Sequence, residues 1–175
     1  MFELADVLEL CNLMEAHGIL YWLDGGWAVD GLLGKQTRPH ADIDIVIQHL
    51  DVPLLRQLLA ADGFKDEYRP DTCPWNFVMG DELGREVDFH TVVFDSSGNG
   101  LYGPSEKGDM FTKEALTGKG KIGGKTVPCI SPQALVNFHT GYQPDENDFK
   151  DVSALCIKFG IDLPELYSPF IPNNR

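Results

Sequence analysis

Apolar residues recur at helical spacing in five stretches of the chain, four of which end at a glycine. The predicted helices cover about residues 3–17, 27–33, 51–63, 131–140 and 145–159. Asp51 and Ser131 stand at N-cap positions with a proline within the next two residues, which favours a helix start at each. Gly160 is expected to end the last helix.

Short runs of β-branched and aromatic residues between these helices predict strands. They lie at about 19–23, 42–47, 75–79 and 85–94, and a hairpin about Gly123 and Gly124 covers 119–130. Residues 95–108 are rich in glycine and proline and have no period, so they are expected to form a long surface loop, which could also serve as a lid. The predicted strands are mixed and come first along the chain, and the helices concentrate toward its end. This order indicates an α+β fold.

Composition narrows the class of protein. With 175 residues and 43% hydrophobic content, the chain is expected to fold as one domain, or as one domain with a short appendage. A net charge of −13 argues against a nucleic-acid partner, because phosphate binding needs a surplus of Lys and Arg. An acidic N-terminal segment and the lack of a long apolar run argue against export and membrane insertion. Four scattered cysteines are typical of a cytoplasmic protein.

The first candidate for chemistry is the pair Asp42 and Asp44 in the strand at 42–47. Side chains alternate along a strand, so both carboxylates face the same way while Ile43, Ile45 and Ile47 face the core. A separation of about 6–7 Å follows from a rise of roughly 3.3 Å per residue. This spacing suits two carboxylates that converge on a pair of divalent ions. By itself the pair also fits a strand with a polar face.

A second strand adds acidic and titratable groups. Glu86, Asp88 and His90 share one face of the strand at 85–94. If this strand lies beside the strand of Asp42 and Asp44, the carboxylates repel one another unless metal ions neutralise them. A third carboxylate could complete the metal coordination or accept a proton from an attacking hydroxyl.

Asp24, Gly25 and Gly26 form the turn between the first strand and the helix that follows. Two glycines let a phosphate approach the backbone, and the helix start offers free N–H groups with a favourable dipole. A pair of glycines is also an ordinary turn. Here it opens the helix that leads into the strand of Asp42 and Asp44.

The glycine pair, the two aspartates sixteen residues later and Asp88 resemble the nucleotidyltransferase superfamily. Residues 21–30 and 34–44 are similar to the lincosamide nucleotidyltransferases and, more distantly, to the aminoglycoside 2''-adenylyltransferases. Residues 128–131 and 138–142 extend the lincosamide-type resemblance, whereas the middle of the chain is least alike. The resemblance implies a mixed-sheet catalytic core over residues 1–128, a small helical portion over 129–175, and a cleft between them.

The resemblance also implies the reaction: such enzymes transfer a nucleoside monophosphate from Mg-ATP to an antibiotic hydroxyl and release pyrophosphate. By position, Asp42, Asp44 and Asp88 hold magnesium ions, two in number, and Asp88 is the general base. Gly25 and Gly26 cradle the triphosphate. These are small-molecule partners, and the sequence leaves open whether a second copy of the chain completes the site.

The sequence offers little positive charge to bind pyrophosphate, so the candidate residues are few. Arg38 and His40 flank the strand of Asp42 closely enough to touch phosphate, and Arg38 is the preferred candidate. Lys150 stands one position off the apolar stripe of the last helix, where it either reaches the nucleotide or is a solvated lysine.

The acceptor is expected to contact His90 and Tyr142, while His139 is read as a buried, hydrogen-bonded histidine. Large aromatic residues are read as core rather than as base-stacking platforms: Trp22, Trp27 and Phe138. An aminoglycoside acceptor is the nearest alternative, since an acidic cleft concentrates a polycationic sugar. A protein or tRNA acceptor and a non-catalytic nucleotide- or metal-binding module are further alternatives, the acidic balance counting against tRNA.

Overall fold

The computed structural model describes residues 1–104 and 109–171, and within them nine strands form one mixed sheet. The strands are β1 (Tyr21–Asp24), β2 (Asp42–Gln48), β3 (Lys65–Glu67), β4 (Asn76–Gly80), β5 (Glu86–Phe94), β6 (Gly100–Tyr102), β7 (Asp109–Phe111), β8 (Gly118–Ile122) and β9 (Lys125–Cys129). The helices are α1 (Leu4–Ala16), α2 (Gly25–Leu33), α3 (Val52–Ala61), α4 (Pro132–Phe138) and α5 (Glu146–Phe159), with 3₁₀ turns η1 (His49–Asp51), η2 (Ala115–Thr117) and η3 (Glu165–Phe170).

The sheet runs in the order β3-β4-β5-β2-β1-β9-β8, and β6 pairs with β5 and with β7. The pairs β2 with β5 and β1 with β9 are parallel, whereas the other neighbours are antiparallel. The strand that carries Asp42 therefore lies at the centre, between β1 and β5. The α+β class and the mixed sheet predicted for the chain are both confirmed.

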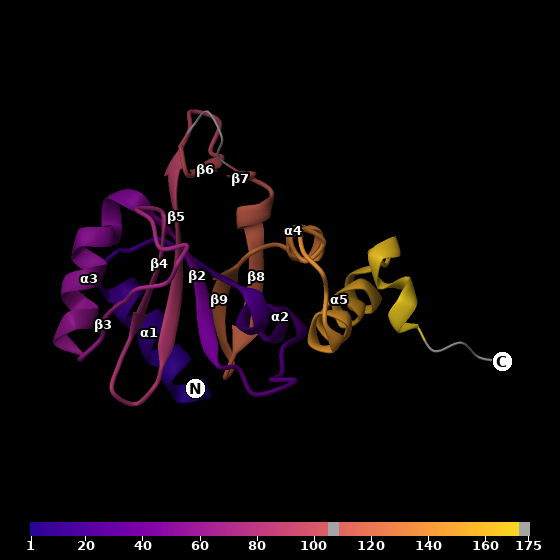
Figure 1. Cartoon of the computed structure of the whole chain (residues 1–175), viewed down its shortest axis with the longest axis horizontal. Helices are drawn as coiled ribbons and strands as arrows, with labels where there is room; N and C mark the ends of the chain where they lie inside the picture. Colours follow the sequence, from indigo (N-terminus) through magenta and orange to yellow (C-terminus); the bar gives the residue numbers. More distant parts are fainter. Residues whose placement is uncertain (105–108, 172–175) are drawn as a thin grey trace.

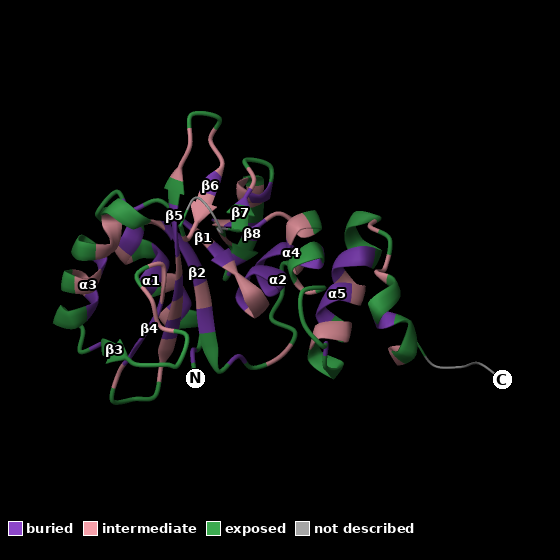
Figure 2. Cartoon of the chain, turned by 45° about the horizontal axis from the view of Figure 1, so that its top comes forward, coloured by how far each residue is buried: buried purple, intermediate pink, exposed green. Residues whose placement is uncertain are grey.

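Helices cover the sheet from two sides. Figure 1 shows α1 and α3 on one side of the central strands and α2, α4 and α5 on the other. The buried side chains of both layers belong to one hydrophobic core, and Figure 2 shows burial concentrated in β2 and the strands beside it. No helix within 1–104 and 109–171 is long and apolar enough to cross a membrane.

The last three helical segments lie at one end of the molecule (Figure 1). The rings of Phe149 and Phe170 stack with centroids 5.4 Å apart, and the hydroxyl of Tyr167 donates to the carbonyl of His139 at 2.8 Å. This aromatic packing joins α5 and η3 to the end of α4. The division of the chain at residue 128 stays a prediction, and β9 continues one residue beyond it, to Cys129.

The prediction of a surface loop at 95–108 is wrong for part of its length. Gly100–Tyr102 forms β6, which pairs with Val92, Val93 and Phe94 of β5. A three-residue strand gives no detectable alternation, and Gly100 is required there because a Cβ atom would meet the side chain of Val92 at 2.9 Å. Residues 95–99 and 103–104 carry no helix or strand, as predicted, and the part of the prediction at 105–108 falls outside the described residues. The short strands β3 and β7 were missed for the same reason.

Two predicted helix caps differ in detail. Asp51 and Ser131 do precede α3 and α4, but neither side chain accepts a hydrogen bond from the helix start. In both helices a proline occupies one of the first two positions and supplies the fixed backbone angle instead. The second helix begins at Gly25 rather than Trp27, which moves its N-terminus onto the glycine pair.

The helix α2 approaches the sheet closely through two glycines. A Cβ atom on Gly120 of β8 would lie 2.6 Å from the backbone carbon of Gly31 and 2.8 Å from the sulfur of Cys129. Backbone and a buried thiol cannot move aside at low cost. This contact sets the depth at which α2 sits on the sheet.

We therefore expect Gly120→Ala to lower the free energy of unfolding by about 2 kcal/mol, as overpacking does. The matched control is Gly31→Ala. Its Cβ atom would meet Ile122 at 3.3 Å, and alanine has a higher helix propensity than glycine. The free energy of unfolding should therefore change by no more than about 1 kcal/mol. Urea unfolding of both variants checks this, and equal stability of Gly120→Ala and the parent chain would contradict it.

Candidate active site

Three neighbouring strands bring three carboxylates into one row across the sheet. Asp24 of β1 lies opposite Asp44 of β2, and Asp44 lies beside Asp88 of β5. Residues paired in register have their side chains on the same face. Asp42 lies on the same face of the sheet, two residues before Asp44 along β2, where it pairs with Glu86. The adjacency of the two acidic strands expected from the sequence is confirmed.

The other face of these strands fixes the register. Ile43, Ile45 and Ile47 are fully buried, and so are Val87 and Phe89 of β5. A slip by one residue would turn these apolar side chains toward the carboxylate face and bury the acids in the core. The hydrophobic core therefore holds the carboxylates together despite their repulsion.

The donor set fits a metal ion. Asp44, Asp88 and His90 each offer one ligand atom within 4.8 Å of the others. One carboxylate oxygen of Asp88 is buried and, among the described residues, has no hydrogen-bond partner. A buried oxygen without a partner is costly unless a cation meets it. Asp42 lies outside this three-residue group and is exposed.

Burial and mutual repulsion raise the pKa of these carboxyl groups. The pKa of Asp44 is well above its ordinary value, first because of burial and then because of the charges on Asp24, Asp42 and Asp88. Burial also raises the pKa of Asp88, against the opposing effect of His90. A bound cation reverses both penalties, because it favours the charged form of each group.

The start of α2 lies directly against this row. The side chain of Asp24 accepts a hydrogen bond from the backbone N–H of Gly25 at 2.8 Å and caps the helix. Gly25 has a φ of +54°, and a Cβ atom there would collide with the carboxylate of Asp44. A Cβ atom on Gly26 would collide with the ring of His40. Both glycines are therefore required for the helix N-terminus to approach the carboxylates.

A buried polar network supports this turn from below, and sequence reasoning missed its centre, Asp30. The carboxylate of Asp30 contacts Nε2 of His40 at 2.5 Å and accepts hydrogen bonds from the backbone and the hydroxyl of Thr37. Asp30 and His40 are 1% and 3% exposed. His40 was considered as a phosphate ligand, but it lies buried in this network. The signal that could have identified Asp30 in the sequence is a carboxylate among the apolar residues of α2.

The two predicted phosphate-binding cations lie in different surroundings. Arg38 lies beside the glycine turn, with Nη2 3.0 Å from the position of a Cβ atom on Gly26. Its guanidinium forms an ion pair with Asp151 of α5 at 2.9 Å. Lys150 is exposed on the same helix. The structure brings Arg38 to the carboxylate row and leaves Lys150 at the surface.

A cavity of about 440 Å³ opens beside the row. Asp24 and His90 line it together with an aromatic wall formed by Tyr102, Phe111 and Phe138. The wall is continuous, since the rings of Phe111 and Phe138 meet edge to face at 5.3 Å and those of Tyr102 and Phe111 at 5.9 Å. His90, one of the two predicted acceptor contacts, is therefore part of a pocket next to Asp88.

The other aromatic and histidine predictions had mixed outcomes. Phe138 is 38% exposed and lines the cavity, so placing it in the core was wrong. Trp27 is buried, as expected. His139 is half-buried, and its Nδ1 lies 2.8 Å from the carbonyl of Leu135. Tyr142 lies next to the pocket residue Gly141, but its hydroxyl donates to Asp148 at 2.9 Å.

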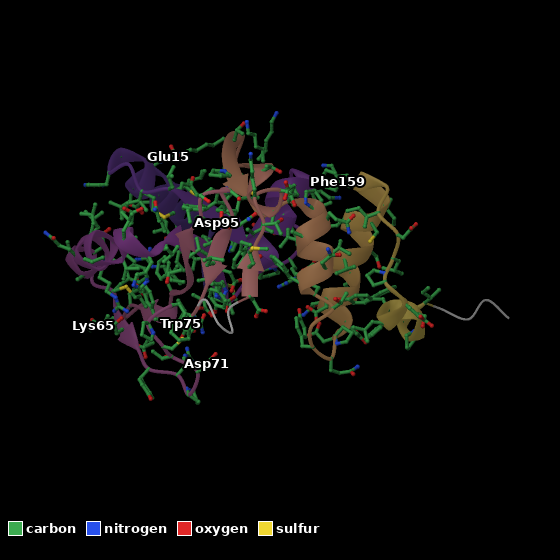
Figure 3. The ribbon with its side chains drawn as sticks, turned by 90° about the horizontal axis from the view of Figure 1, so that it is seen from above. Glu15, Lys65, Asp71, Trp75, Asp95 and Phe159 are labelled. Carbon is green, nitrogen blue, oxygen red and sulfur yellow. The ribbon has the colours of Figure 1, made fainter. Side chains whose placement is uncertain are left out.

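A second, more polar cavity of about 310 Å³ lies on the β4 side of the row. Asp42 and Asp88 line it together with Arg69 and Asp71 of the segment between β3 and β4. Arg69 donates to Glu86 at 2.6 Å. Figure 3 labels Asp71 in this segment. The carboxylate row therefore separates an aromatic pocket from a polar one, which gives space for two substrates.

The mixed sheet, the carboxylates on its neighbouring strands and the glycine pair that opens α2 form the arrangement that the resemblance to the nucleotidyltransferases implies. The sequence model of the aminoglycoside-2''-adenylyltransferase family matches residues 6–155. The chain belongs to this family.

Individual relatives agree with this assignment. The chain is 31% identical, over 86% of its length and 92% of the relative, to a lincosamide resistance protein of Staphylococcus haemolyticus. It is similar to the crystal structure of the lincosamide antibiotic adenylyltransferase LnuA with lincomycin bound (TM-score 0.76, 29% identity, 89% of this chain and 96% of that one). The aminoglycoside resistance factor ANT(2'')-Ia shares the fold (TM-score 0.72, 18% identity, 95% and 90% covered).

The charge repulsion in the row has a direct consequence for stability. We expect Asp44→Asn to raise the free energy of unfolding of the metal-free protein by about 1 kcal/mol, because the amide removes a buried charge that other carboxylates repel. Asp42→Asn is the control and should change stability less, since Asp42 is exposed. Thermal unfolding in the presence of a chelator measures both. A less stable Asp44→Asn protein would show that the ionised carboxylate supports the fold.

Proposed function

We propose that this chain transfers AMP from Mg-ATP to a hydroxyl group of a lincosamide antibiotic, releasing pyrophosphate and inactivating the drug. The observation that carries the proposal is the row of Asp24, Asp44 and Asp88 at the N-terminus of α2. Transfer of a nucleotidyl group needs positioning and charge neutralisation more than covalent help, and this row would supply both through the metal ions that it holds. The lincosamide assignment rests on LnuA and the staphylococcal relative.

Asp42, Asp44 and Asp88 are the residues that would hold two magnesium ions. When bound, the ions neutralise phosphate charge and lower the pKa of a hydroxyl group. Asp88 acts as the general base: its carboxylate takes the proton as the acceptor oxygen bonds to the α-phosphorus of ATP. The bond from that phosphorus to the bridging oxygen breaks, and pyrophosphate leaves.

The turn of Gly25 and Gly26 and the guanidinium of Arg38 bind the triphosphate, with the N–H of Gly26 as the donor, because the N–H of Gly25 already donates to Asp24. The first turn of α2 presents free N–H groups and the positive end of the helix dipole. Arg38 adds a planar set of donors beside the same turn. Lys150 stays the second predicted cation for the leaving pyrophosphate, although its side chain lies exposed on α5. ATP as the donor places the reaction in the cytoplasm.

The aromatic cavity takes the acceptor. Its volume lies within the usual range of small-molecule sites, roughly 300–1,000 Å³. Phe111 and Phe138 offer apolar area to the alkyl groups of a lincosamide, and Asp24 offers a carboxylate to its amine. His90 and Tyr142 contact its hydroxyl groups. A homodimer stays a prediction.

An aminoglycoside acceptor is the second candidate, favoured by the family model and by the net charge of −13. A polycationic sugar gains little from an aromatic wall, however, because its surface is mostly hydroxyl and ammonium groups. The lincosamide therefore fits the cavity better. A non-catalytic binding module has no need of the third carboxylate that Asp88 supplies.

The test measures pyrophosphate released from Mg-ATP with lincomycin, clindamycin, kanamycin, tobramycin or no acceptor. We expect release with the two lincosamides, and loss of release when a chelator removes the divalent ions. Release with kanamycin and tobramycin alone would establish the second candidate. Mg-ATP binding without release in any sample would sink the proposal in favour of a binding module or another acceptor.

Asp88→Asn separates catalysis from binding. The amide keeps the size of the side chain and cannot take the proton, so we expect turnover to fall by at least about 10³-fold. The stability of the fold should not fall, because Asp88 is another member of the repelling row. Single-turnover assays and thermal unfolding measure the two effects. Full turnover by this variant would remove Asp88 from the role of base.

Phe138→Ala tests the acceptor pocket. It removes apolar area from the wall while leaving the carboxylate row in place, so we expect the KM for lincomycin to rise about tenfold with little change in the KM for ATP. The control is Phe159→Ala, which removes an aromatic ring that is 41% exposed at the end of α5; Figure 3 labels it. A rise in the KM for ATP alone would assign the pocket to the nucleotide.

A further inference from the structure

Arg38 and Asp151 come from distant parts of the chain and meet at the edge of the candidate site. Arg38 lies between α2 and β2, whereas Asp151 lies on α5. Both Nε and Nη2 of Arg38 donate to the same oxygen of Asp151, at 3.2 Å and 2.9 Å. The side chain of Asp151 is 5% exposed and that of Arg38 is 32% exposed. One partner is thus fixed in the interior while the other reaches the solvent side.

The guanidinium is held over the first turn of α2. Nη2 lies 3.0 Å from the position of a Cβ atom on Gly26, so the group contacts the turn itself. Its positive charge also opposes the rise in the pKa of Asp44, which burial and the neighbouring carboxylates cause. Arg38 therefore lies near both the helix N-terminus and the carboxylate row, where a triphosphate would bring its negative charge.

The backbone on both sides of Arg38 is anchored independently of Asp151. Thr37 donates from its N–H and hydroxyl groups to Asp30, and His40 contacts the same carboxylate. These contacts fix the backbone but leave the long arginine side chain free to choose among many rotamers. Asp151 favours one of them by holding the edge formed by Nε and Nη2, and Nη1 adds a longer hydrogen bond, of 3.4 Å, to the carbonyl of Pro39.

We propose that Asp151 is a positioning residue for nucleotide binding: it holds Arg38 over the Gly25–Gly26 turn before ATP arrives. The inference rests on the proposed function for the role of Arg38 toward phosphate. An oriented guanidinium loses less conformational entropy on binding than a free one. Through this pair the helical C-terminal part of the chain contributes to nucleotide binding, although Asp151 itself does not touch the nucleotide.

Asp151→Asn tests this, with Mg-ATP binding to the otherwise intact protein measured by calorimetry in the absence of any antibiotic. We expect the Kd for Mg-ATP to rise about tenfold, and the KM for ATP with it, because the neutral amide holds the guanidinium weakly. The KM for lincomycin should stay within about twofold. The control Glu146→Gln removes an exposed carboxylate from the same helix and should leave the Kd unchanged.

A double-mutant cycle shows whether Asp151 acts through Arg38. In the Arg38→Gln background, Asp151→Asn should change the Kd for Mg-ATP by less than about twofold, since the group that it positions is gone. If the two substitutions raise the Kd for Mg-ATP by factors that multiply in the double variant, the inference is overturned. An unchanged Kd for Asp151→Asn alone would overturn it as well. A parallel rise in both KM values with a lower Tm would mean that Asp151 only supports the fold.

The outcome is distinguishable from failure of the proposed function. If the parent chain binds Mg-ATP but modifies no antibiotic, the proposed reaction is wrong, while the binding cycle still decides the role of Asp151. If Arg38→Gln does not fold because Asp151 is left buried and unpaired, Asp151→Asn alone decides it, because the partly exposed Arg38 stays hydrated.

Discussion

The rest of the structure depends on one electrostatic conflict at the centre of the sheet. Asp24, Asp44 and Asp88 stand side by side on three neighbouring strands, with Asp42 two residues before Asp44, and burial together with the neighbouring charges raises the pKa of Asp44. The conflict persists because a slip by one residue would turn the buried apolar residues of β2 and β5 away from the core. The repulsion lowers the stability of the fold at the site, and the hydrophobic core on the other face of the strands compensates for this loss. Such a balance is typical of a cation-binding site.

The surrounding elements are arranged to bring negative phosphate to these negative groups. Gly25 and Gly26 let the N-terminus of α2 touch the row, and Gly120 lets the same helix sit low on the sheet. Helix dipole, guanidinium and metal ions are three sources of positive charge that meet at one point. The proposed binding of a triphosphate is compatible with a net charge of −13, because binding depends on the local field rather than on the total charge.

Much of this site could be predicted from the sequence, because strand alternation and the turn glycines are local signals. The shared face of Asp42 and Asp44, the matching face at Asp88 and the helix start near Gly25 all follow from spacing alone. The rest depends on pairing between distant segments, which spacing does not encode. The Arg38–Asp151 pair, the exposure of Phe138 in a pocket wall and the addition of the short strand β6 to β5 are of this kind. Asp30 was missed because its partners lie outside its own helix.

The central claim is that the carboxylate row is a two-cation site completed by the nucleotide. The most direct measurement is Mn²⁺ binding, followed by electron paramagnetic resonance, to the protein saturated with a non-hydrolysable ATP analogue. The account predicts two bound ions per chain for the parent protein and the loss of at least one in Asp44→Asn and in Asp88→Asn. The same stoichiometry in the parent and in both variants would contradict it, because the metal would then be held by the nucleotide alone.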